Sequence, residues 1–193
     1  IVRNMVGENY DLGSPPTGYE FGQVALSVRG LTVPDPAGAG FKLVDRLSLD
    51  VRAGEIVCIY GLMGAGRTEL LETLAGRLKA SAGEIVLEGN EISHLSVADR
   101  IAIGLALVPE DRQRDGLVQT MSVGQNLSLA SIMNFTKGFF TQKKAEQDLI
   151  DETIRKVTVK TSGGAAAIGS LSGGNQQKVV VAICEGVVGH RCR

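Results

Sequence analysis

The sequence has almost equal numbers of basic and acidic residues, and it has few aromatic residues. Lysine and arginine number 20 against 21 for aspartate and glutamate, so the formal net charge is −1, and aromatic residues make up 4%. Proteins that bind polynucleotides ordinarily have a basic surface for the phosphates and aromatic side chains on which bases stack. The composition therefore argues against a nucleic-acid partner.

Long hydrophobic runs and metal-binding clusters are also missing. No run of about 18 apolar residues is present, and the start, IVRNMVGENYDL, has neither the apolar core nor the cleavage site of a signal peptide. The three cysteines form no CxxC pair, and the two histidines have no neighbouring ligands at metal spacing. We therefore expect a chain from a reducing compartment, the cytosol, without a disulfide framework.

The remaining composition is that of a folded globular domain. The 193 residues are 44% hydrophobic and 21% charged, which suits one domain with a single core, or a domain with one appendage. Residues 1–22 contain many glycines and prolines with scattered charge, so we interpret them as a linker between domains. The folded domain is expected at residues 23–193.

Short apolar runs alternate with helix-like segments in the first half of this domain. VALSV, LSLDV, EIVCIY, GEIVLEGNEI and LALVPE have the length and composition of strands, whereas TELLETLAGRL and SVADRIAIG favour helices. Strands that alternate with helices predict an α/β sheet that is at least partly parallel. MSVGQNLSLASI and TQKKAEQDLIDETIRKV then indicate a helical insertion at about residues 118–178. NQQKVVVAIC resumes helical character, and the tail EGVVGHRCR fits no element well.

The stretch GLMGAGRT, residues 61–68, differs by one residue from the phosphate-binding pattern G-x-x-x-x-G-K-[ST]. Arg67 stands where the pattern has lysine. Glycines let such a loop wind around a phosphate with its backbone N–H groups inward, and the positive end of the following helix faces the same anion. A match of this kind arises by chance in roughly 1% of chains of this length. A glycine-rich turn without a ligand remains the alternative.

A second motif, LSGGNQQK at residues 171–178, places a serine and two glycines directly before a helix. The Ser172 hydroxyl and the N–H groups of Gly173 and Gly174 offer an anion-binding geometry with a helix dipole behind it. An ordinary helix cap explains this motif alone about as well. It does not explain the motif together with the earlier glycine loop.

The glycine loop, a helical insertion and LSGG before a helix, in this order, resemble the nucleotide-binding domain of ABC transporters. GEIVCIYGLMGAGRTEL resembles the family's Walker A region, and LSGGNQQK resembles its signature motif. More narrowly, GLMGAGRTE, PEDRQRDGL and LSGGNQQKV resemble the second of the two fused ATPase domains of ribose-type monosaccharide importers. The resemblance implies an ABC-type P-loop NTPase with a central, mostly parallel sheet, an antiparallel β subdomain and a helical insertion.

The resemblance also implies two sets of residues that contact nucleotide, with ATP and Mg²⁺ as cofactors. In the family, ATP lies between two domains, and each domain gives its Walker A loop to one nucleotide and its signature loop to the other. The Walker A set here is Gly61, Gly64, Ala65, Gly66, Arg67, Thr68 and Glu69. The signature set is Leu171, Ser172, Gly173, Gly174 and Gln176.

Two positions decide what chemistry such a site supports. The resembled second domain commonly has arginine at position 67, and because a guanidinium is broad and planar, we expect nucleotide binding with poor hydrolysis. Glu110 stands where the family's Q-loop usually has glutamine, which implies a metal ligand beside Thr68 and a catalytic candidate. A carboxylate can coordinate magnesium but cannot donate an amide hydrogen bond. The alternative for Glu110 is an exposed acidic turn with weak local ion pairs.

After the signature helix, the family continues to an apolar strand that ends in Asp-Glu and then to a switch histidine. EGVVGHRCR has no such pair, and His190 comes too early for the switch. We therefore expect a domain truncated at its C-terminal part that lacks groups needed for attack on a γ-phosphate.

The implied function is the ATP-binding subunit of a bacterial monosaccharide importer, on the inner face of the plasma membrane, that couples ATP binding and hydrolysis to transport. Its implied partners are the first ATPase domain of the same polypeptide or a second ATPase chain, membrane permease subunits and, indirectly, a sugar-binding protein. The fragment itself is expected to bind nucleotide weakly. A catalytically inert regulatory or scaffold module and a non-transport ABC ATPase are the alternatives.

Overall fold

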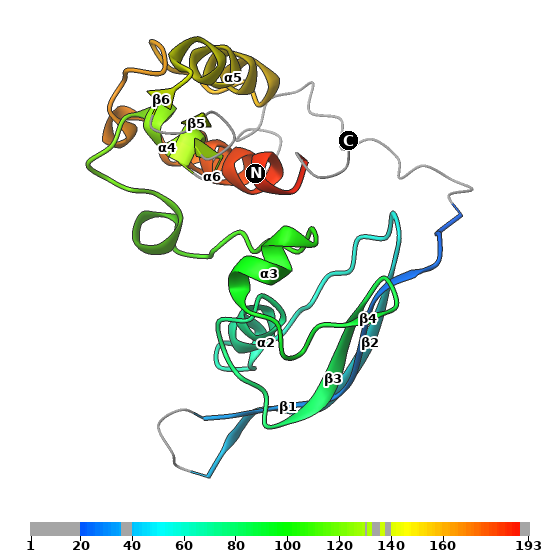
Figure 1. The fold of residues 1–193 in the computed structure, drawn as a ribbon. Helices are drawn as coiled ribbons and strands as arrows, with labels where there is room; N and C mark the ends of the chain where they lie inside the picture. The colour runs from blue at the N-terminus through cyan, green and yellow to red at the C-terminus, as the bar shows by residue number, and fades with distance from the viewer. Residues whose placement is uncertain (1–19, 36–39, 130, 133–135, 138–139, 190–193) are drawn as a thin grey trace.

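The computed structural model describes residues 20–35, 40–129, 131–132, 136–137 and 140–189. Residues 1–19 of the predicted linker lie outside these, as do His190 and Cys192. Figure 1 shows two parts: a sheet with helices α2 and α3 beside it, and a helical part formed by α4, α5 and α6. None of the helices in the described ranges has the length and hydropathy needed to cross a membrane.

Four antiparallel strands form the sheet in the order β2-β1-β3-β4. They are β1 (Val24–Pro34), β2 (Lys42–Arg52), β3 (Ala82–Leu87) and β4 (Asn90–Glu91). In the central strand β1, Val28 lies opposite Leu49 of β2 and Ile85 of β3. VALSV, LSLDV and GEIVLEGNEI are thus confirmed as strands, and they form an antiparallel sheet like the β subdomain that the family resemblance implied.

One face of the sheet is covered by α2 (Arg67–Leu74) and α3 (Val97–Ala102). Leu70 and Leu74 lie one turn apart on α2 and pack into the first hydrophobic core with side chains of β1, β2 and β3. Burial of these leucines fixes how α2 lies against the sheet. The loop that precedes α2 is therefore held at a defined position.

The buried guanidinium of Arg100 joins α3 to the end of α2. Its side chain is 3% exposed and donates to four backbone oxygens, those of Thr73, Leu74, Ser93 and Leu95, at 2.7–3.2 Å. The last carbonyls of a helix have no partner within the helix. Arg100 supplies that partner for α2, and burial lowers the pKa of the guanidinium.

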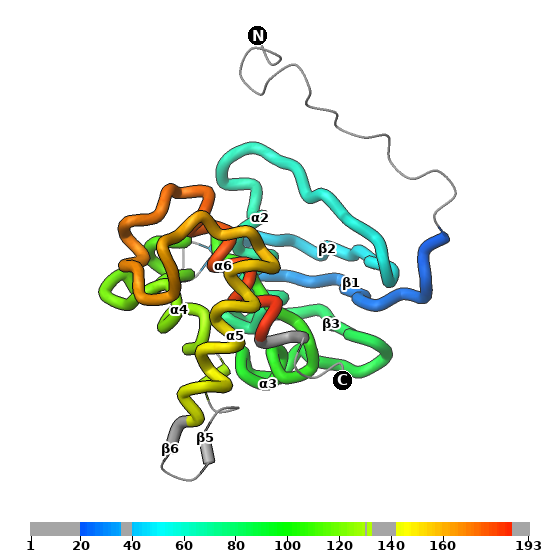
Figure 2. The backbone as a smooth tube through the Cα atoms, turned by 90° about the horizontal axis from the view of Figure 1, so that it is seen from above, coloured from blue at the N-terminus to red at the C-terminus, as the bar shows by residue number. Residues whose placement is uncertain are grey.

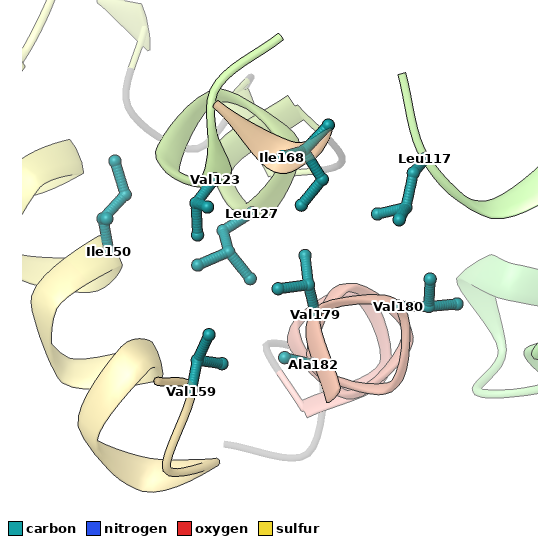
Figure 3. Close-up of a cluster of buried hydrophobic side chains, with 9 residues drawn as sticks. All are labelled: Leu117, Val123, Leu127, Ile150, Val159, Ile168, Val179, Val180 and Ala182. Carbon is teal, nitrogen blue, oxygen red and sulfur yellow. The ribbon is translucent and has the colours of Figure 1, made fainter. Parts of the chain in front are cut away.

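The helical part contains α4 (Val123–Leu129), α5 (Lys143–Lys156), α6 (Gly173–Gly189) and the short hairpin β5 (Thr136–Lys137) and β6 (Phe140–Thr141). Its helices enclose a second hydrophobic core, whose side chains point toward one another in Figure 3. The buried residues of this core are Leu117, Val123, Leu127, Ile150, Val159, Ile168, Val179, Val180 and Ala182. Helix α6 also contacts α3 and the turn at Arg112–Gly116, so it joins the two parts (Figure 2).

The structure differs from the sequence prediction at EIVCIY and LALVPE, which were expected to be strands of a sheet that is at least partly parallel. Neither segment belongs to a described strand, and every described strand pair is antiparallel. Between β2 and α2 the chain runs without a ladder, and Ile56 and Tyr60 are 96% and 90% exposed (Figure 1). A strand needs a neighbour for its backbone N–H and C=O groups, and none of the described strands supplies one here. The tail also differs, because α6 continues through EGVV to Gly189.

The reactivity of the two described cysteines tests whether the segment EIVCIY is exposed. Cys58, within EIVCIY, is exposed, whereas Cys184 of α6 is half-buried and burial raises the pKa of its thiol. A raised pKa leaves less thiolate at a given pH, so alkylation at pH 8 should be roughly tenfold or more faster at Cys58 than at Cys184. The measurement is mass-spectrometric labelling in a Cys192→Ser background. Equal rates would contradict the exposed placement of residues 56–60.

Candidate functional site

Residues 61–66 form a tight glycine-rich turn that ends where α2 begins. Gly64 and Gly66 each have a φ of 78°, a left-handed conformation that favours glycine. A Cβ placed on Gly66 would lie 2.1 Å from the carbonyl oxygen of Leu43 in β2. The turn is thus packed closely against the sheet at Gly66, while residues 62–65 are exposed to solvent.

Helix α2 directs its N-terminus toward this turn. Gly66 is its N-cap and provides no side-chain hydrogen bond. The first N–H groups of a helix have no partner within the helix, and the helix dipole places positive charge at the same end. Arg67 folds back over the turn, because its Cδ lies 3.7 Å from where a Cβ on Gly61 would be. The N–H groups and the guanidinium together make this end of α2 suitable for an anion.

The structure brings Thr68 and Glu110 together, although they are 42 residues apart in the sequence. The Thr68 hydroxyl donates a hydrogen bond to Oε2 of Glu110 at 3.3 Å, and both residues are exposed. A hydroxyl and a carboxylate are oxygen ligands of the kind that Mg²⁺ takes, usually together with phosphate oxygens and water. The described residues include no group of three or more His, Cys, Asp or Glu that could hold a metal ion. The donors present fit a magnesium ion that is shared with a phosphate.

A cavity of about 730 Å³ lies between α2 and residues 107–115. It is lined by Arg67 and Thr68 on one side and by Glu110 and Arg112 on the other. Its volume is within the range of small-molecule sites. The end of the glycine loop and Glu110, the predicted catalytic candidate, therefore line the same cavity.

Ion pairs balance much of the charge around this cavity. Arg77 lies 3.6 Å from Glu72 and 3.8 Å from Asp115, and Arg114 lies 3.0 Å from Asp115. The hydrogen bond from Arg114 holds the pKa of the Asp115 carboxyl below its usual value. Among the ion pairs formed by described residues, none includes Arg67. Arg112, which also lines the cavity, forms none either. The guanidinium groups of Arg67 and Arg112 therefore face an incoming anion without a carboxylate partner among the described residues.

The second predicted set lies at the start of α6, in the helical part. Leu171 is half-buried, and Ser172, Gly173 and Gly174 are exposed. The Gln176 N–H donates to the Ser172 carbonyl at 3.0 Å, which begins the helical hydrogen bonds. The signature residues are thus on a different element from residues 61–69 and do not line the cavity described above.

Arg112 connects the two sets, and nothing in the local sequence indicated this role. Its Nε donates to Oε1 of Gln176 at 3.2 Å, and Nε2 of Gln176 donates to the Ile168 carbonyl at 3.2 Å. Gln176 is 5% exposed. A Cβ on Gly173 would lie 2.8 Å from Nη2 of Arg112, so glycine at this position admits the guanidinium. The segment of residues 107–115, which contains Glu110 and Arg112, is therefore in contact with the signature motif.

The sequence profile of the ABC transporter family matches residues 44–186, a range that includes the glycine loop, Glu110 and the LSGG motif. The chain belongs to the ABC transporter family. By family it is an ABC-type ATPase, as its glycine loop and signature motif suggested.

Curated relatives of similar sequence are sugar-import proteins. The chain is 40% identical over 182 residues to the xylose import ATP-binding protein XylG of Ralstonia nicotianae, which covers 94% of this chain and 35% of the relative. It is 40% identical over 186 residues to XylG of Escherichia coli K12, which covers 95% of this chain and 36% of that relative. The chain thus spans about a third of the length of these proteins.

Solved structures of ABC cassettes share the fold. The ADP conformation of an ATP-binding cassette of an ABC transporter superposes with a TM-score of 0.70 at 20% identity, over 86% of this chain and 65% of that one. A dimeric bacterial ABC transporter cassette gives 0.67 at 18% identity, over 82% and 68%. The predicted α/β fold of the ABC type is therefore confirmed. Among the described residues its sheet is antiparallel.

Proposed function

We propose that this chain is an ATP-binding domain of a bacterial sugar ABC importer, and that it takes the place of the second ATPase domain, which couples ATP binding and hydrolysis to transport. The observation that carries the proposal is the hydrogen bond between Thr68 and Glu110 at the N-terminus of α2. Two distant segments place oxygen ligands for a cation beside a helix end that favours an anion. Magnesium nucleotide is a ligand that supplies both charges.

In this proposal the phosphates lie against the N–H groups of the glycine loop and of the first turn of α2. The contacting residues are Gly61, Gly64, Ala65, Gly66, Arg67, Thr68 and Glu69. Thr68 and Glu110 would hold a magnesium ion, whose chemistry would be to supply positive charge for phosphoryl transfer to water. Leu171, Ser172, Gly173 and Gly174 serve the nucleotide held by a partner ATPase domain. Gln176, also predicted to contact nucleotide, is 5% exposed and bonded to Arg112 and Ile168, so it supports the motif from behind.

Arg67 makes this site weaker than a site with lysine. Lysine has a compact ammonium on a thin stem, whereas the planar guanidinium cannot occupy the same space between β- and γ-phosphates. We therefore propose that the chain binds nucleotide and hydrolyses it poorly at its own Walker A loop. A catalytically inert regulatory module is the second candidate, which Arg67 and Glu110 both favour. Steady ATP hydrolysis by the full-length fused chain that is lost in Ser172→Arg supports the transport role, because hydrolysis then depends on the signature motif of this chain. Hydrolysis that is unchanged in Ser172→Arg supports the inert module.

The proposed partners follow from the family and from the names of the relatives. They are a first ATPase domain in the same polypeptide or a second ATPase chain, membrane permease subunits and, indirectly, a sugar-binding protein. The chain would then lie on the inner face of the plasma membrane, with residues 1–22 as connector, 23–193 as ATPase domain and about 118–178 as helical subdomain.

Titration with a fluorescent ATP analogue tests the proposal. The chain should bind the analogue with Mg²⁺ at up to millimolar concentration, and Thr68→Ala should weaken Mg²⁺-dependent binding by roughly tenfold or more, because a ligand to a charged group is lost. Thr120→Ala, which removes an exposed hydroxyl outside the cavity, is the matched control and should bind as the wild type does. Absence of binding, or an unchanged affinity in Thr68→Ala, would contradict the proposal.

A further inference from the structure

Asn175, in the first turn of α6, bridges two segments of the helical part. Its Oδ1 accepts a hydrogen bond from the backbone N–H of Lys160 at 3.0 Å, and its Nδ2 donates to Oγ of Ser172 at 3.0 Å. A backbone N–H can only donate, so the amide atom that faces Lys160 must be the oxygen. The NH₂ group must then face Ser172, and the orientation of the amide is fixed by chemistry.

This orientation determines what the Ser172 hydroxyl can do. A hydroxyl has one hydrogen to donate and two lone pairs that accept. Because Asn175 donates to Oγ, the hydroxyl hydrogen of Ser172 is turned away from Asn175 and is available to another acceptor. Ser172, Gly173 and Gly174 are exposed at the positive end of α6, so the donors gather where an anion is favoured.

The backbone at Lys160, to which the Asn175 amide is bonded, is itself held in place by its neighbours. Val159 is buried in the second core, and Nζ of Lys178 donates to the Thr158 carbonyl at 2.8 Å, so the backbone at Lys160 is fixed against α6. Gln176, the next residue after Asn175, cannot replace it, because its amide is already engaged with Arg112 and Ile168.

We propose that Asn175 is a positioning residue, which makes Ser172 a dedicated hydrogen-bond donor to a phosphate oxygen of the nucleotide held by a partner domain. The inference rests on the proposed function, because it assigns a nucleotide to the signature motif. It adds that the amide of Asn175, anchored on the Lys160 N–H, decides the direction in which the serine proton points.

Asn175→Asp separates the two hydrogen bonds of this bridge. The carboxylate has the same shape and still accepts from Lys160, but it accepts from the Ser172 hydroxyl as well and turns the proton inward. The Lys160 amide resonance should therefore stay protected from hydrogen exchange in Asn175→Asp and lose protection in Asn175→Leu. A retained amide signal shows that the local fold is intact.

The functional measurement is MgATP-dependent association of two copies of the chain, followed by sedimentation velocity. Ser172→Ala and Asn175→Asp should each weaken association roughly ten- to hundredfold, because each removes a hydrogen bond to a charged group. The double variant should be no weaker than Ser172→Ala alone, since both changes remove the same contact. Gln177→Glu, with the same change of charge on α6 but outside the bridge, should stay within about threefold of the wild type.

Each contrary outcome identifies what fails. If Asn175→Asp weakens association as much in the Ser172→Ala background as in the wild type, its effect is that of charge, and the positioning role is overturned. If Ser172→Ala has no effect, or if MgATP produces no association of the wild-type chain, the assignment of nucleotide to the signature motif is overturned and the positioning role with it.

Discussion

Gly66→Ala is expected to abolish nucleotide binding at the glycine loop. The new Cβ would lie 2.1 Å from the carbonyl oxygen of Leu43, well inside any allowed contact, so the turn or the β2 backbone must move. Such movement displaces the N–H groups of residues 66–68 from the positions that face the phosphate. Each hydrogen bond to a charged phosphate that is lost costs about 1.5–3 kcal/mol, so the affinity should fall by roughly a hundredfold or more. Titration with the fluorescent ATP analogue measures the loss.

Gly64→Ala provides the matched control for this prediction. Gly64 has the same φ of 78° as Gly66, but a Cβ there has no heavy atom within 4 Å. The control therefore bears the cost of a left-handed alanine, about 1–2 kcal/mol, without the steric clash. We expect its nucleotide affinity to fall much less than that of Gly66→Ala. Equal affinities in the two variants would show that backbone strain, and not the contact with Leu43, governs the loop.

Arg100→Met is expected to cause the largest loss of stability in the part that holds the glycine loop. The substitution keeps an unbranched apolar stem and removes a buried guanidinium with four acceptors. The carbonyls of Thr73 and Leu74 at the end of α2 then lose their buried donor and the charge that complements the helix dipole. Each buried carbonyl left without a donor costs about 1–3 kcal/mol, so the free energy of unfolding should fall by roughly 3 kcal/mol or more. Urea unfolding followed by circular dichroism measures it.

Arg155→Met is the control for the stability measurement. Arg155 lies on the exposed side of α5, and its Nε donates to the carbonyl of Asp151 in the same helix. Its loss should change the free energy of unfolding by less than about 0.5 kcal/mol, as is usual for surface positions. A loss at Arg100 as small as that at Arg155 would contradict the assigned role of the buried guanidinium.

Patterns of short range in the sequence predicted most of the ordered elements. The short apolar runs VALSV and LSLDV lie in β1 and β2, and the leucine spacing of TELLETLAGRL predicted α2. EIVCIY and LALVPE have the same apolar character, yet neither forms a ladder in the structure. An apolar composition indicates that a segment is suited to a strand. A strand also requires a neighbouring strand that pairs with its backbone N–H and C=O groups.

The candidate site was predicted unevenly for the same reason. The residues of the glycine loop and of LSGG are contiguous, so spacing alone indicated them. The roles of Arg112 and Asn175 were missed, because Gln176 lies 64 residues from Arg112 and Lys160, which anchors the Asn175 amide, lies 15 residues from Asn175. The contact between Thr68 and Glu110 was expected only through family resemblance, and the fold brings it about across 42 residues.

The sequence by itself determined the family, the order of the two anion-binding motifs and the exchange of lysine for arginine at position 67, because each depends on residues that are adjacent in the chain. The tertiary structure alone decided that Gly66 is packed against β2, that Glu110 meets Thr68, and that Asn175 directs the Ser172 proton. These depend on backbone groups and side chains brought together by the burial of two hydrophobic cores. The hydrophobic effect is not directional. The order of apolar residues in the sequence therefore does not indicate which polar groups folding will bring into contact.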